Sequence, residues 1–260
     1  TGVAETQDFA GTIDLALALN PDVKRVYAIH DYTDSGLAVR NEMEAILPEY
    51  SDRVEITFSP DVSYKELEDS IRNLPADSVV LIMTYVTDAI GRTFTRAEST
   101  RLISSLSPVP VYAMHETRLG YGIVGGRLLE GLEHGRQAAE LALRVLNGGN
   151  PSDLPVEKST SHLMLDYQVL SKFHLSEKHV PSGAAYINKP VSWWEENNGV
   201  LLPILGITGG LVMVVLLLSW MLIRIRQAQH ARHEIETRLA ESNRVMQAIL
   251  EHTHIMAVLL

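Results

Sequence analysis

The feature that most constrains this chain is an apolar run over residues 199–223, which contains no charged side chain. An α-helix rises about 1.5 Å per residue, so about 20 apolar residues are enough to cross the hydrocarbon layer of a bilayer. Inside lipid the backbone must satisfy its own hydrogen bonds, which favours a helix. Soluble core helices rarely run so long without a polar face. The run therefore predicts one transmembrane helix.

The charges that flank the run predict its direction in the membrane. Arg224, Arg226 and Arg232 follow it, whereas Glu195 and Glu196 precede it. Loops rich in Lys and Arg stay on the cytoplasmic side. We therefore expect residues 1–198 outside a bacterial cell membrane, in the periplasm or its equivalent, and residues 224–260 in the cytoplasm.

Composition narrows the function classes of the large outer segment. The chain has a formal net charge of −10, which makes nucleic acid an improbable partner. It contains no cysteine, which excludes disulfides, thiolate catalysis and cysteine-based zinc sites. We expect no catalytic site, metal or cofactor in this chain.

The outer segment alternates between strand and helix patterns. We expect strands at residues 23–30, 53–58, 79–83, 109–114 and 162–165. Helices are expected at residues 37–47, after Ser63, after Thr95, at 125–146 and at 167–173. Ser63 with Glu66 and Thr95 with Glu98 have the spacing of capping boxes. This alternation predicts an α/β fold with a mostly parallel sheet.

Ligands of such sheets bind beyond the carboxyl ends of the strands. Polar residues follow three of the expected strands, so we take them as candidate ligand-binding residues. They are Asp31, Thr33, Tyr85, His115, Glu116 and Arg118.

Several spaced segments resemble one known family. The chain opens with "TGVAE", followed by "LALNPDVKRVYAIHD", by "PVPVYAMHETRLGYGIVGGRLLEGLEHGRQAAELALRVLNGGNPSDLPV" and by "LDYQVLSKFHL". Residues 1–196 are similar to periplasmic sensor domains related to ABC-transporter substrate-binding proteins, with the type 1 periplasmic-binding fold, which are often fused to sensor histidine kinases.

The resemblance implies two α/β lobes with a ligand cleft between them. Residues 12–114 would form most of lobe two, and residues 118–150 the return helix of lobe one. The N-terminal half of lobe one would be missing, so we expect this helix to lack its strand partners.

The tail after the apolar run has its own pattern. Residues 224–250 are expected to be a signalling helix with a short, imperfect coiled-coil seam at Ala228, Ile235, Leu239, Met246 and Ile249. A solvated charged helix is the alternative. The segment "LAESNRVMQAILEHTHIMAVLL" resembles the entry helix and first strand of a PAS domain, which would start at residues 251–260.

Two local motifs suggest other chemistry. His30-Asp31 is the pair found in HD-type metal hydrolases, although a turn aspartate after a strand is the commoner meaning. Residues 122–126 are rich in glycine, which suits either an anion-binding loop or a tight entry into a helix.

The sequence thus predicts the input part of a transmembrane receptor, with the parent protein a two-component sensor histidine kinase. An unidentified small molecule, or a ligand-loaded partner, would close the lobes, and a homodimer would relay closure through the membrane helix to a PAS domain. The sensor of a diguanylate cyclase, or a membrane-tethered solute-binding subunit of an ABC transporter, is the alternative.

Overall fold

The computed structural model describes residues 1–191 and 193–258. The chain divides into two compact units, Thr1–Pro190 and Val191–Leu260. Each unit is described by itself.

The first unit is built on a sheet of seven strands. In spatial order they are β3 (Glu55–Phe58), β2 (Arg25–Ile29), β4 (Ser78–Ile82), β5 (Val111–Ala113), β6 (Gly125–Leu129), β8 (Ser161–Asp166) and β9 (Ala185–Ile187). Every neighbouring pair is parallel except β6 and β8. The expected α/β fold with a mostly parallel sheet is therefore confirmed.

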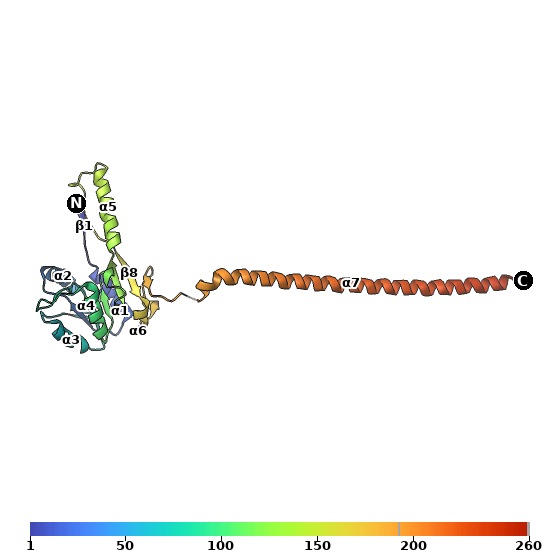
Figure 1. Ribbon diagram of the computed structural model, residues 1–260, viewed down its shortest axis with the longest axis horizontal. Coiled ribbons are helices and arrows are strands. Elements are labelled where there is room, and N and C mark those ends of the chain that lie inside the picture. The colour runs from blue at the N-terminus through green and yellow to red at the C-terminus, as the bar shows by residue number, and fades with distance from the viewer. Residues whose placement is uncertain (192, 259–260) are drawn as a thin grey trace. The chain divides into compact units, whose positions relative to one another are not determined.

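Helices cover both faces of this sheet (Figure 1). We call the sheet and these helices the body. The apolar core on one face packs α1 (Phe9–Leu19) and α2 (Asp34–Glu44), and the core on the other packs α3 (Tyr64–Arg72) and α4 (Arg96–Leu106). The strand β4 is buried along its whole length because both faces are covered. A short helix, α6 (Tyr167–Lys172), follows β8.

The two expected capping boxes start α3 and α4. The Ser63 and Thr95 side chains accept hydrogen bonds from the amides of Glu66 and Glu98. The two glutamates in turn accept from the capping residues' amides, at 3.0 Å for Ser63 and 2.8 Å for Thr95. Both helix starts were thus predictable from local spacing alone.

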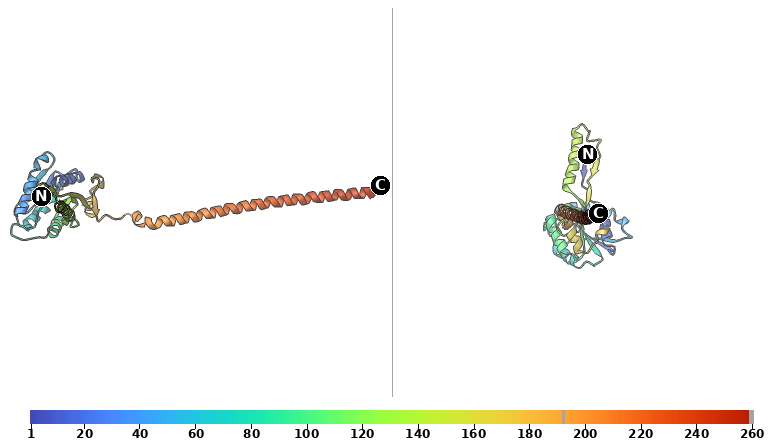
Figure 2. Two further views of the ribbon diagram at one scale, coloured as in Figure 1. Left: turned by 90° about the horizontal axis from the view of Figure 1, so that it is seen from above. Right: turned by 90° about the vertical axis from the view of Figure 1, so that its right-hand side faces the viewer.

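A smaller part, which we call the arm, stands away from the body (Figures 1 and 2). It consists of β1 (Gly2–Ala4), α5 (Gly131–Leu146) and β7 (Val156–Lys158). The strands β1 and β7 form a two-stranded parallel sheet, and α5 contacts β1. The expectation that this helix lacks strand partners is therefore wrong, since two short strands accompany it.

The helix expected over residues 125–146 is wrong in its first part. Residues 125–129 form β6 between β5 and β8, and α5 begins only at Gly131. A Cβ on Gly125 would lie 2.0 Å from the Met164 carbonyl oxygen of β8. Gly125 and Gly126 thus allow close approach of neighbouring strands, and they do not open a helix.

The second unit is one helix, α7 (Trp193–Val258), with Pro203 inside it. Its segment Gly199–Gln247 includes a stretch that could span a membrane by length and composition, with a mean hydropathy of 2.6. Helix continues through residues 251–258, and the rest of the expected PAS start, residues 259–260, lies outside the described residues.

Candidate functional site

The candidate residues gather at the carboxyl edge of the body's sheet, where β2, β4 and β5 end. From β2 the chain passes to β3 on one side and later to β4 on the other, so the order of strands reverses here. In open α/β sheets, such a reversal leaves a crevice in which ligands bind. The side chains at this edge therefore decide what the site can hold.

Asp31 lies where the strand order reverses, and its carboxylate is occupied by hydrogen bonds within the chain. Its Oδ2 accepts from the Val86 amide at 2.8 Å, and its Oδ1 accepts from the Thr33 amide at 3.2 Å and from the Thr33 hydroxyl. Thr33 caps α2 by accepting from the Gly36 amide. The Asp31 carboxylate thus ties together the loops after β2 and β4, and Thr33 starts a helix.

His30 is buried beside Asp31 but does not point to it as a metal-ligand pair would. Its Nδ1 lies 2.7 Å from the Asp31 backbone oxygen, and its ring packs against Tyr32 and Phe58. Burial lowers the pKa of His30. Within the described residues no group of three His, Cys, Asp or Glu side chains could hold a metal ion. The geometry does not favour the metal-hydrolase alternative.

Tyr85 lies inside the core rather than on an open surface. Its side chain is 3% exposed and stacks on Phe94, with 5.8 Å between ring centroids. Burial raises the pKa of Tyr85, and its hydroxyl has no hydrogen-bond partner in the described part of the chain.

Arg118 is buried at the end of a short 3-10 helix, η2 (Glu116–Arg118). Its Nη1 donates to the Ser99 and Thr100 hydroxyls and to the Arg96 carbonyl, and its Nη2 donates to the Met83 carbonyl. Burial and Arg96 lower the pKa of Arg118 to about 9, so the side chain keeps its charge at neutral pH. It fastens α4 and the end of β4 to η2.

His115 lies close to two arginines, Arg96 and Arg118, at the same edge. Its pKa is lowered to about 4 by burial and by the charges of Arg96 and Arg118. Its Nε2 lies 3.6 Å from Glu5 Oε1, and because the imidazole is neutral near pH 7 this contact is not an ion pair. Arg96 is exposed at the first position of α4 and was not among the predicted residues. Its place after the cap Thr95 was the signal that could have found it.

Glu116 points to the arm. Its Oε1 accepts a hydrogen bond of 2.8 Å from the amide of Gly131, the first residue of α5. Glu116 also borders a surface hollow of about 440 Å³, together with Thr117, Leu119, Tyr121, Met164 and Ile187. A hollow of similar size lies near Lys24 and Glu55, at the amino end of β2 and β3, and so lies far from this edge.

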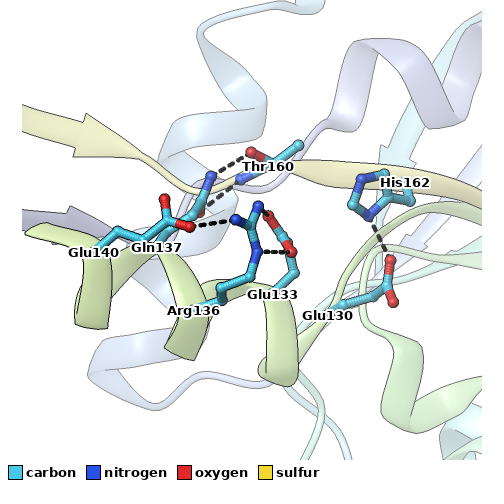
Figure 3. A network of polar contacts seen from close by, with 7 residues as sticks. All are labelled: Glu130, Glu133, Arg136, Gln137, Glu140, Thr160 and His162. Carbon is cyan, nitrogen blue, oxygen red and sulfur yellow. Dashed lines mark hydrogen bonds and ion pairs between the residues drawn. The ribbon is translucent and has the colours of Figure 1, made fainter.

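Three single-chain crossings join the arm to the body, at residues 5–8, at residue 130 and at residues 159–160. Polar contacts link the crossings to neighbouring elements and, in one case, to each other. Figure 3 shows Glu130 beside His162 and Gln137 beside Thr160. The Thr6 amide donates to the Ser159 hydroxyl at 2.8 Å.

Four of the six predicted residues are buried, namely Asp31, Tyr85, His115 and Arg118. Asp31 and Arg118 tie loops and elements together, and Tyr85 belongs to the core. His115 and Glu116 face the crossings, and Thr33 caps a helix. The edge thus holds two arginines, Arg96 and Arg118, and it contacts the arm through Glu116. It contains no arrangement of nucleophile, base and oxyanion donors among the described residues.

Comparisons with known proteins give a family and a fold. Residues 1–178 match the family model described as ABC transporter substrate binding protein. No curated protein matches the chain.

Solved structures of low sequence identity share the fold. A ligand-free, open substrate-binding protein with adhesive properties from Clostridium difficile has a TM-score of 0.55 at 17% identity, over 72% of this chain and 63% of that one. An ABC domain in complex with L-Trp from Streptococcus pneumonia has a TM-score of 0.55 at 16% identity, with the same coverage. The chain therefore spans less than two thirds of these relatives.

Proposed function

This chain belongs to the ABC transporter substrate-binding protein family, and from that premise we propose that it is the ligand-binding input portion of a bacterial membrane receptor. The proposal rests on the order of two features along the chain. A substrate-binding fold over residues 1–178 is followed on the same chain by a helix that reaches Val258 and includes an apolar stretch long enough to span a bilayer.

The parent protein in this proposal is a two-component sensor histidine kinase, whose activity lies outside this chain. Residues 1–198 face outward from the cell membrane, and the tail from Arg224 lies in the cytoplasm, as its arginines favour. The helix of a second copy pairs along the seam that includes Ile235, Leu239 and Met246, whose side chains are exposed in the single chain.

The ligand in this proposal is a small organic molecule with an anionic group. Arg96 and Arg118 lie at the same edge, because the Arg118 guanidinium donates to the Arg96 carbonyl at 3.2 Å. Both charges lower the pKa of the adjacent His115. The Asp31 carboxylate already accepts three hydrogen bonds within its own loops. A ligand carboxylate near Arg96 would supply the negative charge that these cations favour. The L-Trp held by the pneumococcal relative carries a carboxylate of this kind.

A membrane-tethered substrate-binding subunit of an ABC transporter is the second candidate, because the family match fits it equally well. The two proposals differ in the cytoplasmic tail. A receptor needs residues 224–258 to pass its signal on, whereas a tethered transport subunit works without them. The sensor of a diguanylate cyclase has the same input portion as the first proposal and differs only in the output enzyme.

Calorimetry of the full chain in lipid nanodiscs tests the ligand proposal, with a panel of small carboxylates that starts with L-tryptophan. We expect at least one compound to bind, and Arg96→Gln to weaken it about tenfold or more, because a charge-assisted hydrogen bond is lost. Arg101→Gln, on the same helix but stacked on Tyr121, is the matched control. Binding of no carboxylate, or equal losses in the two variants, would contradict the proposal.

A further inference from the structure

The helix α5 has no cap from its own N-terminal residue. Glu130 occupies the capping position but makes no side-chain cap bond. Its carboxylate instead contacts His162 of β8, as Figure 3 shows. The first amides of a helix need partners that the helix itself does not supply. One of these partners comes from outside α5.

Glu116 supplies it from the body. Its Oε1 accepts from the Gly131 amide at 2.8 Å, across 15 positions of sequence. A carboxylate at a helix N-terminus is favourable both as a hydrogen-bond acceptor and because of the helix dipole. The arm's one helix is therefore capped by a residue of the sheet's carboxyl edge.

The same stretch of chain carries the site. His115 and Glu116 are consecutive, and both reach the crossings. His115 lies against Glu5 of the first crossing, and Glu116 caps α5 directly after the second. Arg118, two residues further, fixes η2 to α4 through three hydrogen bonds and to the end of β4 through a fourth. A movement of this stretch is passed on to α5, since the carboxylate and the Gly131 amide are joined.

We propose that Glu116 is a positioning residue that couples the ligand-binding edge to the arm by capping α5 from the body. A ligand shifts the balance between two arrangements of a protein only as far as it binds one of them more tightly than the other. Contact between the ligand-binding edge and the arm gives the two arrangements different affinities. A ligand that displaces the loop after β5 strengthens or breaks the cap, and the arm changes its angle to the body accordingly. The signalling consequence rests on the proposed function, whereas the cap does not.

The test measures the arm's position without any ligand. The chain contains no cysteine, so two introduced cysteines carry the only spin labels. Glu42 on α2 and Ala139 on α5 are both exposed, and Glu42→Cys with Ala139→Cys gives a body-to-arm distance by pulsed electron resonance. The full chain in nanodiscs serves as the sample.

Two variants remove the cap from opposite sides. Glu116→Ala deletes the acceptor. Gly131→Pro deletes the donor at the first helical position, where proline is well tolerated. Glu130, which precedes it, has φ −100° and ψ 125°, a conformation that a following proline allows. If Glu116→Ala fails to fold, Gly131→Pro still carries the test.

We expect each variant to reduce the population at the wild-type distance relative to other distances by about fivefold. The double variant should do no more than either alone, because both remove the same bond. Glu116→Gln keeps an acceptor oxygen and should restore the wild-type distribution. Glu140→Ala, which removes a carboxylate that pairs with Arg136 of the same helix, is the control.

Wild-type distributions in both Glu116→Ala and Gly131→Pro would overturn the proposal, as would equal changes in Glu140→Ala. The outcome is independent of the ligand experiment, since no ligand is added. A chain that binds no carboxylate but shows the cap effect loses the proposed ligand class and keeps the coupling. The reverse result keeps the ligand and loses the coupling.

Discussion

At the scale of single residues, burial gives polar side chains roles that their positions in the sequence do not show. Arg118 follows a strand, which favours a ligand contact, yet the residue is 1% exposed and its guanidinium donates to oxygens of its own chain. A buried cation is tolerated when such acceptors surround it. Its contribution to the site is to hold η2 in place and to add positive charge.

His115 makes stability depend on pH. Its pKa in the folded chain is about 4, below the 6.5 of a free histidine, so the unfolded chain binds more protons between these values. Stability is therefore full above about pH 6.5 and falls as the pH drops toward about 4. We expect His115→Gln to flatten this part of the profile, as measured by thermal unfolding of the full chain in detergent. His174→Gln, a change at another histidine of the same unit, is the control, and an unchanged slope in His115→Gln would refute the assignment.

At the scale of elements, helices with clear sequence signals were predicted well, whereas short strands were not. The capped helices α3 and α4 begin where their boxes predict. The strand β6 was mistaken for the start of α5 because a short apolar run after glycines has no period of its own. The strands β1, β7 and β9 have three residues each, which is too short for a pattern to show.

Glycine substitutions test the assignment of β6. Gly125 has φ +140°, and a Cβ there would meet the Met164 carbonyl at 2.0 Å. We expect Gly125→Ala to lower the free energy of unfolding by about 3 kcal/mol or more, through strain and overpacking. Gly135 lies in α5 with open space around it, so Gly135→Ala should raise the free energy of unfolding by about 0.5–1 kcal/mol. Chemical denaturation of both variants is the measurement, and similar effects of the two would place Gly125 outside a packed strand.

At the scale of the whole molecule, one chain joins a binding fold to a long apolar helix. The family match covers the first and stops before the second, since it ends at residue 178. Neither feature alone indicates a receptor. Their succession on one chain, with arginines after the apolar run, is what the proposed topology rests on.

Protease applied to intact cells tests this topology. We expect cleavage within residues 1–198 and protection of the tail after Arg226, because only the outer part is accessible. Antibodies against tags at each end would read the two fragments, and lysed cells in which both parts are cut serve as the control. Protection of the large part in intact cells would reverse the orientation.

The sequence by itself determined the features that depend on neighbours along the chain. The apolar run, the capped helices, the buried strand β4 and the α/β alternation all follow from interactions within a few residues or from a repeating pattern. The positions of strand ends followed as well, which is why the predicted residues fall on one edge of the sheet.

Only the tertiary structure decided what those residues do. Glu116 caps a helix 15 residues away, Arg118 is enclosed by α4, and Arg96 joins the site from another element. These roles depend on burial and on partners brought together by the fold. A polar side chain acts through whatever lies within hydrogen-bond distance, and that distance is set by the packing of elements that are remote in sequence.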